Sequence, residues 1–92
     1  MATFDYNQIQ EHLQSGWTFN VEKNEIEKEF SFKDFLEALS FVNKAGAMAQ
    51  AQDHHPNIFI HDYNQVLISV ATHSAGGITE NDFKLAAAID TL

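Results

Sequence analysis

Polar and apolar residues alternate along four short stretches of the chain. The alternation covers residues 17–22 and resumes over residues 26–32, after a polar turn at residues 23–25. It returns over residues 58–63 and, more strongly, over residues 65–73. A period of two is typical of half-buried β-strands, so the four stretches predict two hairpins.

Three other stretches carry apolar residues at helical spacing, and each has a capping signal at its start. Thr3 or Asp5 can cap the first helix, Ser31–Asp34 has the form of a capping box for the second, and Thr79–Asp82 caps the third. The second helix must end before Pro56, because the residue before a proline avoids the α region. The apolar positions are Tyr6, Ile9 and Leu13; Phe35, Leu36, Leu39, Val42, Gly46 and Ala49; and Phe83, Leu85, Ala86 and Ile89.

The resulting order of elements is αββαββα, over a single domain of residues 1–92. Two hairpins with helices between them predict an α+β fold, with a four-stranded antiparallel sheet and helices packed on one face. Within residues 65–73, one face carries Val66, Ile68, Val70 and Thr72, and the other carries Leu67, Ser69, Ala71 and His73. If the helices cover the β-branched face, His73 points to the opposite, open face.

Composition narrows the class of protein. The residues are 45% apolar, which is typical of a globular domain, and a formal net charge of −8 argues against direct binding of nucleic-acid backbones. The absence of cysteine removes disulfides, thiolate nucleophiles and cysteine zinc sites. No signal peptide is visible, and no apolar run approaches the ~20 residues that cross a bilayer. We therefore expect a soluble, cytoplasmic domain without nucleic-acid or membrane partners.

Imidazole and carboxylate groups concentrate in the second half of the chain. Asp53-His54-His55-Pro56 is followed by His73 and by Asp82. Histidine exchanges protons near neutral pH, so the group indicates acid–base chemistry on a small molecule. Adjacent residues in an extended segment point in opposite directions, so His54 and His55 do not suit one metal ion. One of them can line a pocket while the other braces it.

The two carboxylates also have structural explanations. Asp82 stands at the third position of its helix, where an acid stabilises the free N–H groups by ~0.5–1 kcal/mol. On the sequence alone, that explanation is preferred. A negative charge suits a helix C-terminus poorly, so Asp53 is better explained by a role beside His54, where a carboxylate fixes the imidazole tautomer. His12 and His61 are expected to be surface or packing residues.

Other kinds of site fit less well. The histidines and aspartates lack the usual metal-ligand spacings, such as two histidines one turn apart on a helix, so no metal is expected. Ser69 and Ser74 flank His73, but the strand–elbow–helix motif of a serine hydrolase is missing. The loop Ala75–Gly77 has neither the lysine nor the spacing of a phosphate-binding loop.

Taken together, these motifs resemble the pterin-4a-carbinolamine dehydratase family. The resemblance extends from Trp17 to the end of the chain, and its HHP…TH…D pattern is more specific than any pair of histidines. It is carried by Phe30–Phe35, Asp53-His54-His55-Pro56, Tyr63-Asn64, Thr72-His73, Gly77-Ile78-Thr79 and Asp82.

The resemblance implies a lyase that uses neither a metal nor an organic cofactor. Its substrate would be a 4a-hydroxytetrahydropterin, and its products a quinonoid dihydropterin and water, in the recycling of tetrahydropterin. One proton must reach the leaving hydroxyl and another must leave ring N5, and histidines suit both transfers. By resemblance, His54 and His73 are the principal acid/base pair, and His55 mainly positions the pterin.

The resemblance also implies supporting roles. Asp82 would orient His73, Asp53 would assist His54, and Pro56 would set the turn. The expected substrate-binding residues are Gln50, Asp53, Pro56 and Thr72. Family members commonly carry an acid at the place of Gln50; the neutral amide can still hydrogen-bond a pterin, but it cannot pair with a cation by charge. Trp17 can contact the ring or be structural, and the structural role is preferred.

A second function belongs to another class of protein. Relatives can act as dimerisation partners of a transcription factor, so a non-catalytic, coactivator-like interaction module is the alternative. A domain this small gains stability from oligomerisation, and the family forms dimers and tetramers, so we expect a homodimer or homotetramer. The intact His54, His55 and His73 favour the enzyme.

Overall fold

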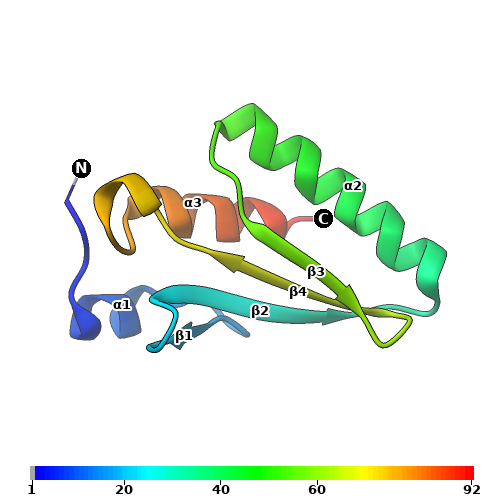
Figure 1. Ribbon diagram of the computed structural model, residues 1–92, viewed down its shortest axis with the longest axis horizontal. Coiled ribbons are helices and arrows are strands. Elements are labelled where there is room, and N and C mark those ends of the chain that lie inside the picture. Colours follow the sequence, from blue (N-terminus) through cyan, green and yellow to red (C-terminus); the bar gives the residue numbers. More distant parts are fainter. Residues whose placement is uncertain (1) are drawn as a thin grey trace.

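Three helices and four strands follow one another in the predicted order (Figure 1). The computed structural model describes residues 2–92. The elements are α1 (Tyr6–His12), β1 (Thr18–Asn20), β2 (Glu25–Ser31), α2 (Phe35–Gln52), β3 (Asn57–His61), β4 (Gln65–Val70), the 3₁₀ helix η1 (His73–Ala75) and α3 (Glu80–Ile89). The α+β fold with αββαββα order is therefore confirmed.

The four strands form one antiparallel sheet in the order β1-β2-β4-β3. The two hairpins meet along β2 and β4, where Ile26 is paired with Val70, and Ile58 of β3 is paired with Ile68 of β4. Because side chains alternate between faces, these residues share one face of the sheet. Ile26, Ile68 and Val70 are almost fully buried, so this face forms the core.

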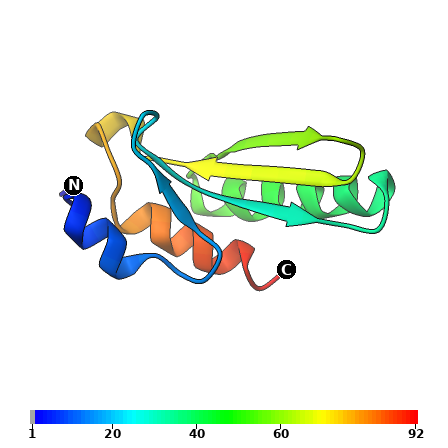
Figure 2. The ribbon, with the colours of Figure 1, turned by 90° about the horizontal axis from the view of Figure 1, so that it is seen from below.

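The helices cover the β-branched face, as predicted. Ala38, Phe41, Ala45 and Ala49 on α2 and Leu85 and Ile89 on α3 are buried with the strand residues in one cluster. Figure 2 shows α2 behind the strands, so the side of the sheet that faces the viewer is not covered by this helix. That bare side, called the open face below, carries Glu25, Glu27 and Glu29 of β2, Leu67 and Ser69 of β4, and Asn57, Phe59 and His61 of β3.

Two of the three predicted helix starts are confirmed, and one is corrected. Asp5 caps α1, and Thr79 caps α3 in a capping box with Asp82. The predicted box from Ser31 to Asp34 is wrong. The α2 cap is Asp34, and Ser31 still belongs to β2, where its hydroxyl donates to Gln65 on β4. Strand pairing extends to Ser31, so the helix begins only after it.

The predicted strand over residues 65–73 ends earlier, at Val70. Thr72 forms an isolated bridge with Gly77, and the chain turns between them through η1 and Gly76, which has a φ of 79°. His73 is therefore the first residue of a tight 3₁₀ turn and not a strand residue. The placement of His73 by strand parity is wrong, although its ring is exposed.

Aromatic residues outside the sheet pack as structural residues. Trp17 is buried, and its Nε1–H donates to Oδ2 of Asp90 at 3.0 Å, which confirms the preferred structural role. The ring of His12 packs against Phe4 and Phe83, as expected of a packing histidine. Within residues 2–92, no helix has both the length and the apolar character needed to span a membrane.

Candidate active site

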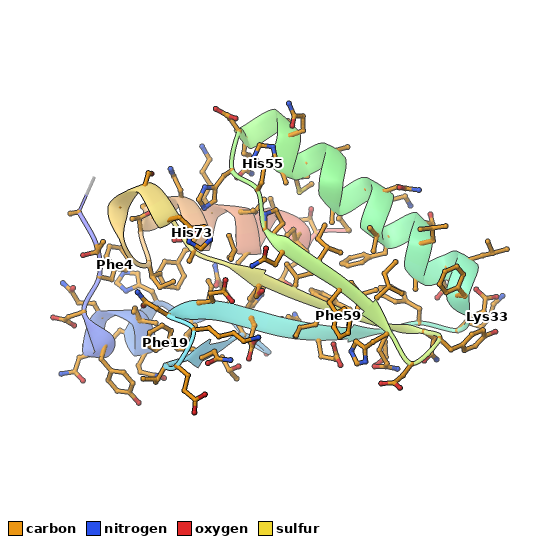
Figure 3. All side chains as sticks on the ribbon, viewed as in Figure 1. Phe4, Phe19, Lys33, His55, Phe59 and His73 are labelled. Carbon is orange, nitrogen blue, oxygen red and sulfur yellow. The ribbon has the colours of Figure 1, made fainter. Side chains whose placement is uncertain are left out.

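Residues from four segments meet at one end of the molecule. The segments are the C-terminal end of α2, the stretch before β3, the turn after β4 and the N-terminus of α3. Figure 3 shows His55 and His73 at this end and Lys33 at the opposite end. The histidines of the two motifs, far apart in sequence, are thus brought to one region.

The central contact joins His54 to Asp82. The Nε2 atom of His54 lies 2.6 Å from Oδ1 of Asp82. Asp82 is fully buried, and the His54 side chain is only 12% exposed. The expected contact of Asp82 with His73 is not formed, because η1 turns His73 away from the direction of β4 while His54 comes in from the end of α2.

Two threonines complete the surroundings of Asp82. Oδ2 accepts a hydrogen bond from the Thr72 hydroxyl at 2.9 Å and another from the Thr79 backbone N–H at 2.8 Å. Because the Thr72 hydroxyl donates to Asp82, its oxygen accepts from the Thr79 hydroxyl, 2.8 Å away. The carboxylate therefore caps α3 through Oδ2 and contacts His54 through Oδ1.

This network fixes the tautomer of His54. The carboxylate accepts from the Thr72 hydroxyl and the Thr79 N–H and, as a carboxylate, has no proton to donate, so His54 donates its Nε2–H to it. In the neutral ring the lone pair is then on Nδ1, which has no hydrogen-bond partner within residues 2–92. The ring is held in position and presents a free basic nitrogen.

His55 is held by a different partner. Its Nε2 lies 2.8 Å from Oε1 of Gln50, one turn back on α2. An amide oxygen accepts only, so His55 donates Nε2–H and its Nδ1 is also left with the lone pair. Both residues are exposed, so this contact orients His55 at the surface of the site.

The chain path between α2 and β3 depends on Asp53 and Pro56. Asp53 ends α2 in the left-handed conformation, with φ 51° and ψ 43°, and its N–H bonds to the carbonyl of Ala49. Its side chain is exposed and makes no hydrogen bond to His54, so the expected assistance of His54 by Asp53 is not seen. Asp53 acts instead as the helix C-cap, and Pro56 follows as the residue before β3.

Thr79 was missed as a site residue by sequence reasoning. Its hydroxyl and its N–H both belong to the Asp82 network, in addition to its role as the α3 cap. The T-x-x-D pattern was the available signal, since a capping box predicts that the threonine and the aspartate lie side by side.

A separate charged cluster lies on the open face, at the end of β3. His61 contacts Oδ2 of Asp62 at 2.6 Å and Oε1 of Glu29 at 2.7 Å, and it stacks on Phe59. The hydrogen bond to Asp62 is the largest effect and raises the pKa of His61 above its ordinary value. Partial loss of hydration opposes it, and the hydrogen bond to Glu29 and the two negative charges raise the pKa further. His61 is thus a surface residue, as expected. No three His, Asp or Glu residues between 2 and 92 are grouped so as to hold a metal ion.

Comparison with known proteins identifies the family. The model of the family described as "Pterin 4 alpha carbinolamine dehydratase" matches residues 2–92. A protein of Picosynechococcus sp. is 45% identical over 92% of this chain and 91% of its own length. One of Acidobacterium capsulatum is 44% identical over 100% of this chain and 99% of its own. Both relatives bear the name "Putative pterin-4-alpha-carbinolamine dehydratase".

Solved structures agree with this result. The crystal structure titled "transcriptional coactivator/pterin dehydratase from Brucella Melitensis" has a TM-score of 0.90 and 35% identity, covering 98% of this chain and 97% of that one. A pterin dehydratase-like protein identified as a RuBisCO assembly factor in the alpha-carboxysome has a TM-score of 0.68 at 23% identity, which shows a shared fold. The chain described here therefore belongs to the pterin-4a-carbinolamine dehydratase family.

Proposed function

We propose that this protein dehydrates a 4a-hydroxytetrahydropterin to a quinonoid dihydropterin and water, as a step in tetrahydropterin recycling. The observation that carries the proposal is the buried His54–Asp82 pair, 2.6 Å apart, in a chain of the dehydratase family. A carboxylate-held imidazole is an arrangement typical of proton-transfer catalysis.

The reaction needs two proton transfers and no redox change. The C4a–O bond breaks as the hydroxyl leaves with an added proton, and the N5–H proton is removed. The electrons of the N5–H bond form the new C4a=N5 double bond, so the products are the quinonoid dihydropterin and one water. Neither a metal nor an organic cofactor is needed for this balance.

His54 is the proposed base, and His73 the proposed acid. The Asp82 carboxylate holds the Nε2–H of His54 and stabilises the imidazolium that forms when Nδ1 takes the N5 proton. His73 is exposed, its ring has no hydrogen-bond partner within residues 2–92, and it follows Thr72 of the Asp82 network. It is free to give a proton to the leaving hydroxyl.

The other expected site residues act around this pair. His55, oriented by Gln50, would contact the pterin at the surface of the site. Thr72 would act through Asp82, because its hydroxyl is already committed to that carboxylate. Asp53 and Pro56 would shape the turn that carries both adjacent histidines.

The alternative function is a non-catalytic, coactivator-like interaction module. What favours it is the Brucella relative, whose title names both a transcriptional coactivator and a pterin dehydratase. A homodimer or homotetramer would be compatible with either function, and the free outer edges of β1 and β3 leave backbone groups available for association.

The deciding experiment is a stopped-flow assay of carbinolamine dehydration with purified protein. The proposal predicts a rate well above spontaneous dehydration and a quinonoid dihydropterin product. A wild-type rate equal to the spontaneous rate, with folding confirmed by circular dichroism, would refute the enzyme and leave the interaction module.

A further inference from the structure

A cavity lies on the open face of the sheet, on the side away from the helices. Its volume is about 560 Å³, within the usual range for small-molecule sites. It is lined by Lys23, Glu25, Asn57, Phe59, Leu67 and Ser69. Asn57 begins β3 and is paired with Ser69, near the end of β4, so the cavity extends to the histidine end of the sheet.

Glu25 is the chemically distinctive residue of this cavity. It is only 6% exposed, and its Oε2 accepts a hydrogen bond from Nδ2 of Asn57 at 3.0 Å. Its Oε1 has no partner within residues 2–92, and neither has the hydroxyl of Ser69, which is 7% exposed. Both residues line the cavity, so the free carboxylate oxygen and the hydroxyl can bind a ligand that supplies N–H groups.

We propose that Glu25 binds the 2-amino-4-oxopyrimidine edge of the pterin, a role that rests on the proposed function. That edge presents two adjacent N–H donors, the 2-amino group and N3–H, which match the two oxygens of one carboxylate. The neighbouring 4-oxo group is an acceptor, and Lys23 is the cation in the cavity lining. Phe59 and Leu67 supply apolar surface for the ring.

The chain path connects this cavity with the histidines. His55 precedes Asn57 by two residues, and Asn57 donates its Nδ2–H to Glu25, so a short stretch of backbone joins the histidines to the cavity. A ring anchored on Glu25 therefore extends towards His55, with His73 beyond the end of β4.

The test compares ligand binding in two variants and a matched control. Equilibrium titrations use pterin and lumazine. Lumazine has a 2-oxo group in place of the 2-amino group, so it lacks the 2-amino N–H donor that would bind one oxygen of Glu25. We expect the wild type to bind pterin at least tenfold more tightly than lumazine. Glu25→Gln should weaken pterin binding by about tenfold to hundredfold and abolish the preference, and Ser69→Ala should weaken it less.

Glu27→Gln is the control, since Glu27 lies on the same strand and face, loses the same charge and does not line the cavity. It should bind like the wild type. Folding of each variant is checked by circular dichroism and urea unfolding.

The outcomes separate this subsite from the proposed function. A wild type that accelerates dehydration, with Glu25→Gln binding pterin within twofold of it, would overturn the subsite alone. Equal binding of pterin and lumazine by the wild type would also overturn it. A pterin preference that Glu25→Gln abolishes, in a protein without dehydratase activity, would support the subsite and refute the enzyme.

Discussion

Nε2 of His54 lies 2.6 Å from Oδ1 of Asp82, which joins the end of α2 to the beginning of α3. The same carboxylate caps α3 through the Thr79 N–H. One buried group thus fixes the position of a helix and the tautomer of a histidine. In the proposed mechanism, fold stability and proton transfer would therefore be coupled at Asp82.

Replacing Asp82 by asparagine should impair both properties. The amide keeps the size of the side chain but loses the charge that stabilises the His54 imidazolium. We expect the dehydration rate to fall on the order of 10²-fold and the free energy of unfolding to fall by ~1–3 kcal/mol. Stopped-flow rates and urea titrations measure the two effects. Glu80→Gln, an exposed change of equal charge in the first turn of α3, should leave the rate within twofold.

Much of this fold follows from local patterns. Alternation predicted the four strands, and the T-x-x-D pattern predicted the α3 cap, because both depend on residues close in sequence. The sequence did not reveal that Asp82 contacts His54 and not His73. That choice depends on where β4 stops and on the direction in which α2 ends, and both are set by packing between distant segments.

Glu25 illustrates the same limit. The polar run of residues 23–25 has the composition of a turn, yet Glu25 is the first residue of β2 and is buried. Its burial depends on Asn57, which reaches across the open face from β3. Alternation within one strand cannot indicate a contact between two strands that are not neighbours in the sheet.

Gln50→Glu should change the pH dependence of the reaction. A carboxylate at this position would accept the same hydrogen bond from His55 and would favour its protonated form. We expect the acidic limb of the pH–rate profile to move to higher pH. Gln52→Glu adds the same charge to the same end of α2 without a contact to His55, so an equal shift in that variant would contradict this explanation.

Thr72→Val should destabilise the protein. Valine keeps the branched shape, but the Asp82 carboxylate loses one donor and the Thr79 hydroxyl loses its acceptor, both in buried positions. We expect a loss of ~1–3 kcal/mol in the free energy of unfolding, measured by urea titration. Thr18→Val, at an exposed strand position, should stay within ~0.5 kcal/mol. Similar losses in the two variants would count against the proposed network.

His61 should make stability depend on pH. Its pKa is raised in the folded state by Asp62 and then Glu29. Its contribution is therefore complete below the unfolded-state pKa of ~6.5 and is lost as pH rises through the higher folded-state pKa. The thermal stabilities of the wild type and His61→Asn should therefore differ more at pH 5.5 than at pH 8.5. These two pH values lie below and above the ordinary histidine pKa of ~6.5. A difference that grows with pH would have the wrong sign.

The most direct test of the proposed histidine mechanism is the rate of 4a-hydroxytetrahydropterin loss with the wild type, His54→Ala and His73→Ala, each shown to be folded. We predict that the wild type exceeds the spontaneous rate and that each variant loses ~10²-fold or more of the catalysed rate. His12→Ala should retain activity. This histidine belongs to α1, where its Nδ1 contacts the Gln8 carbonyl, and it is not part of the proposed site. A wild-type rate no faster than spontaneous dehydration, or full activity in His54→Ala, would contradict the proposed mechanism.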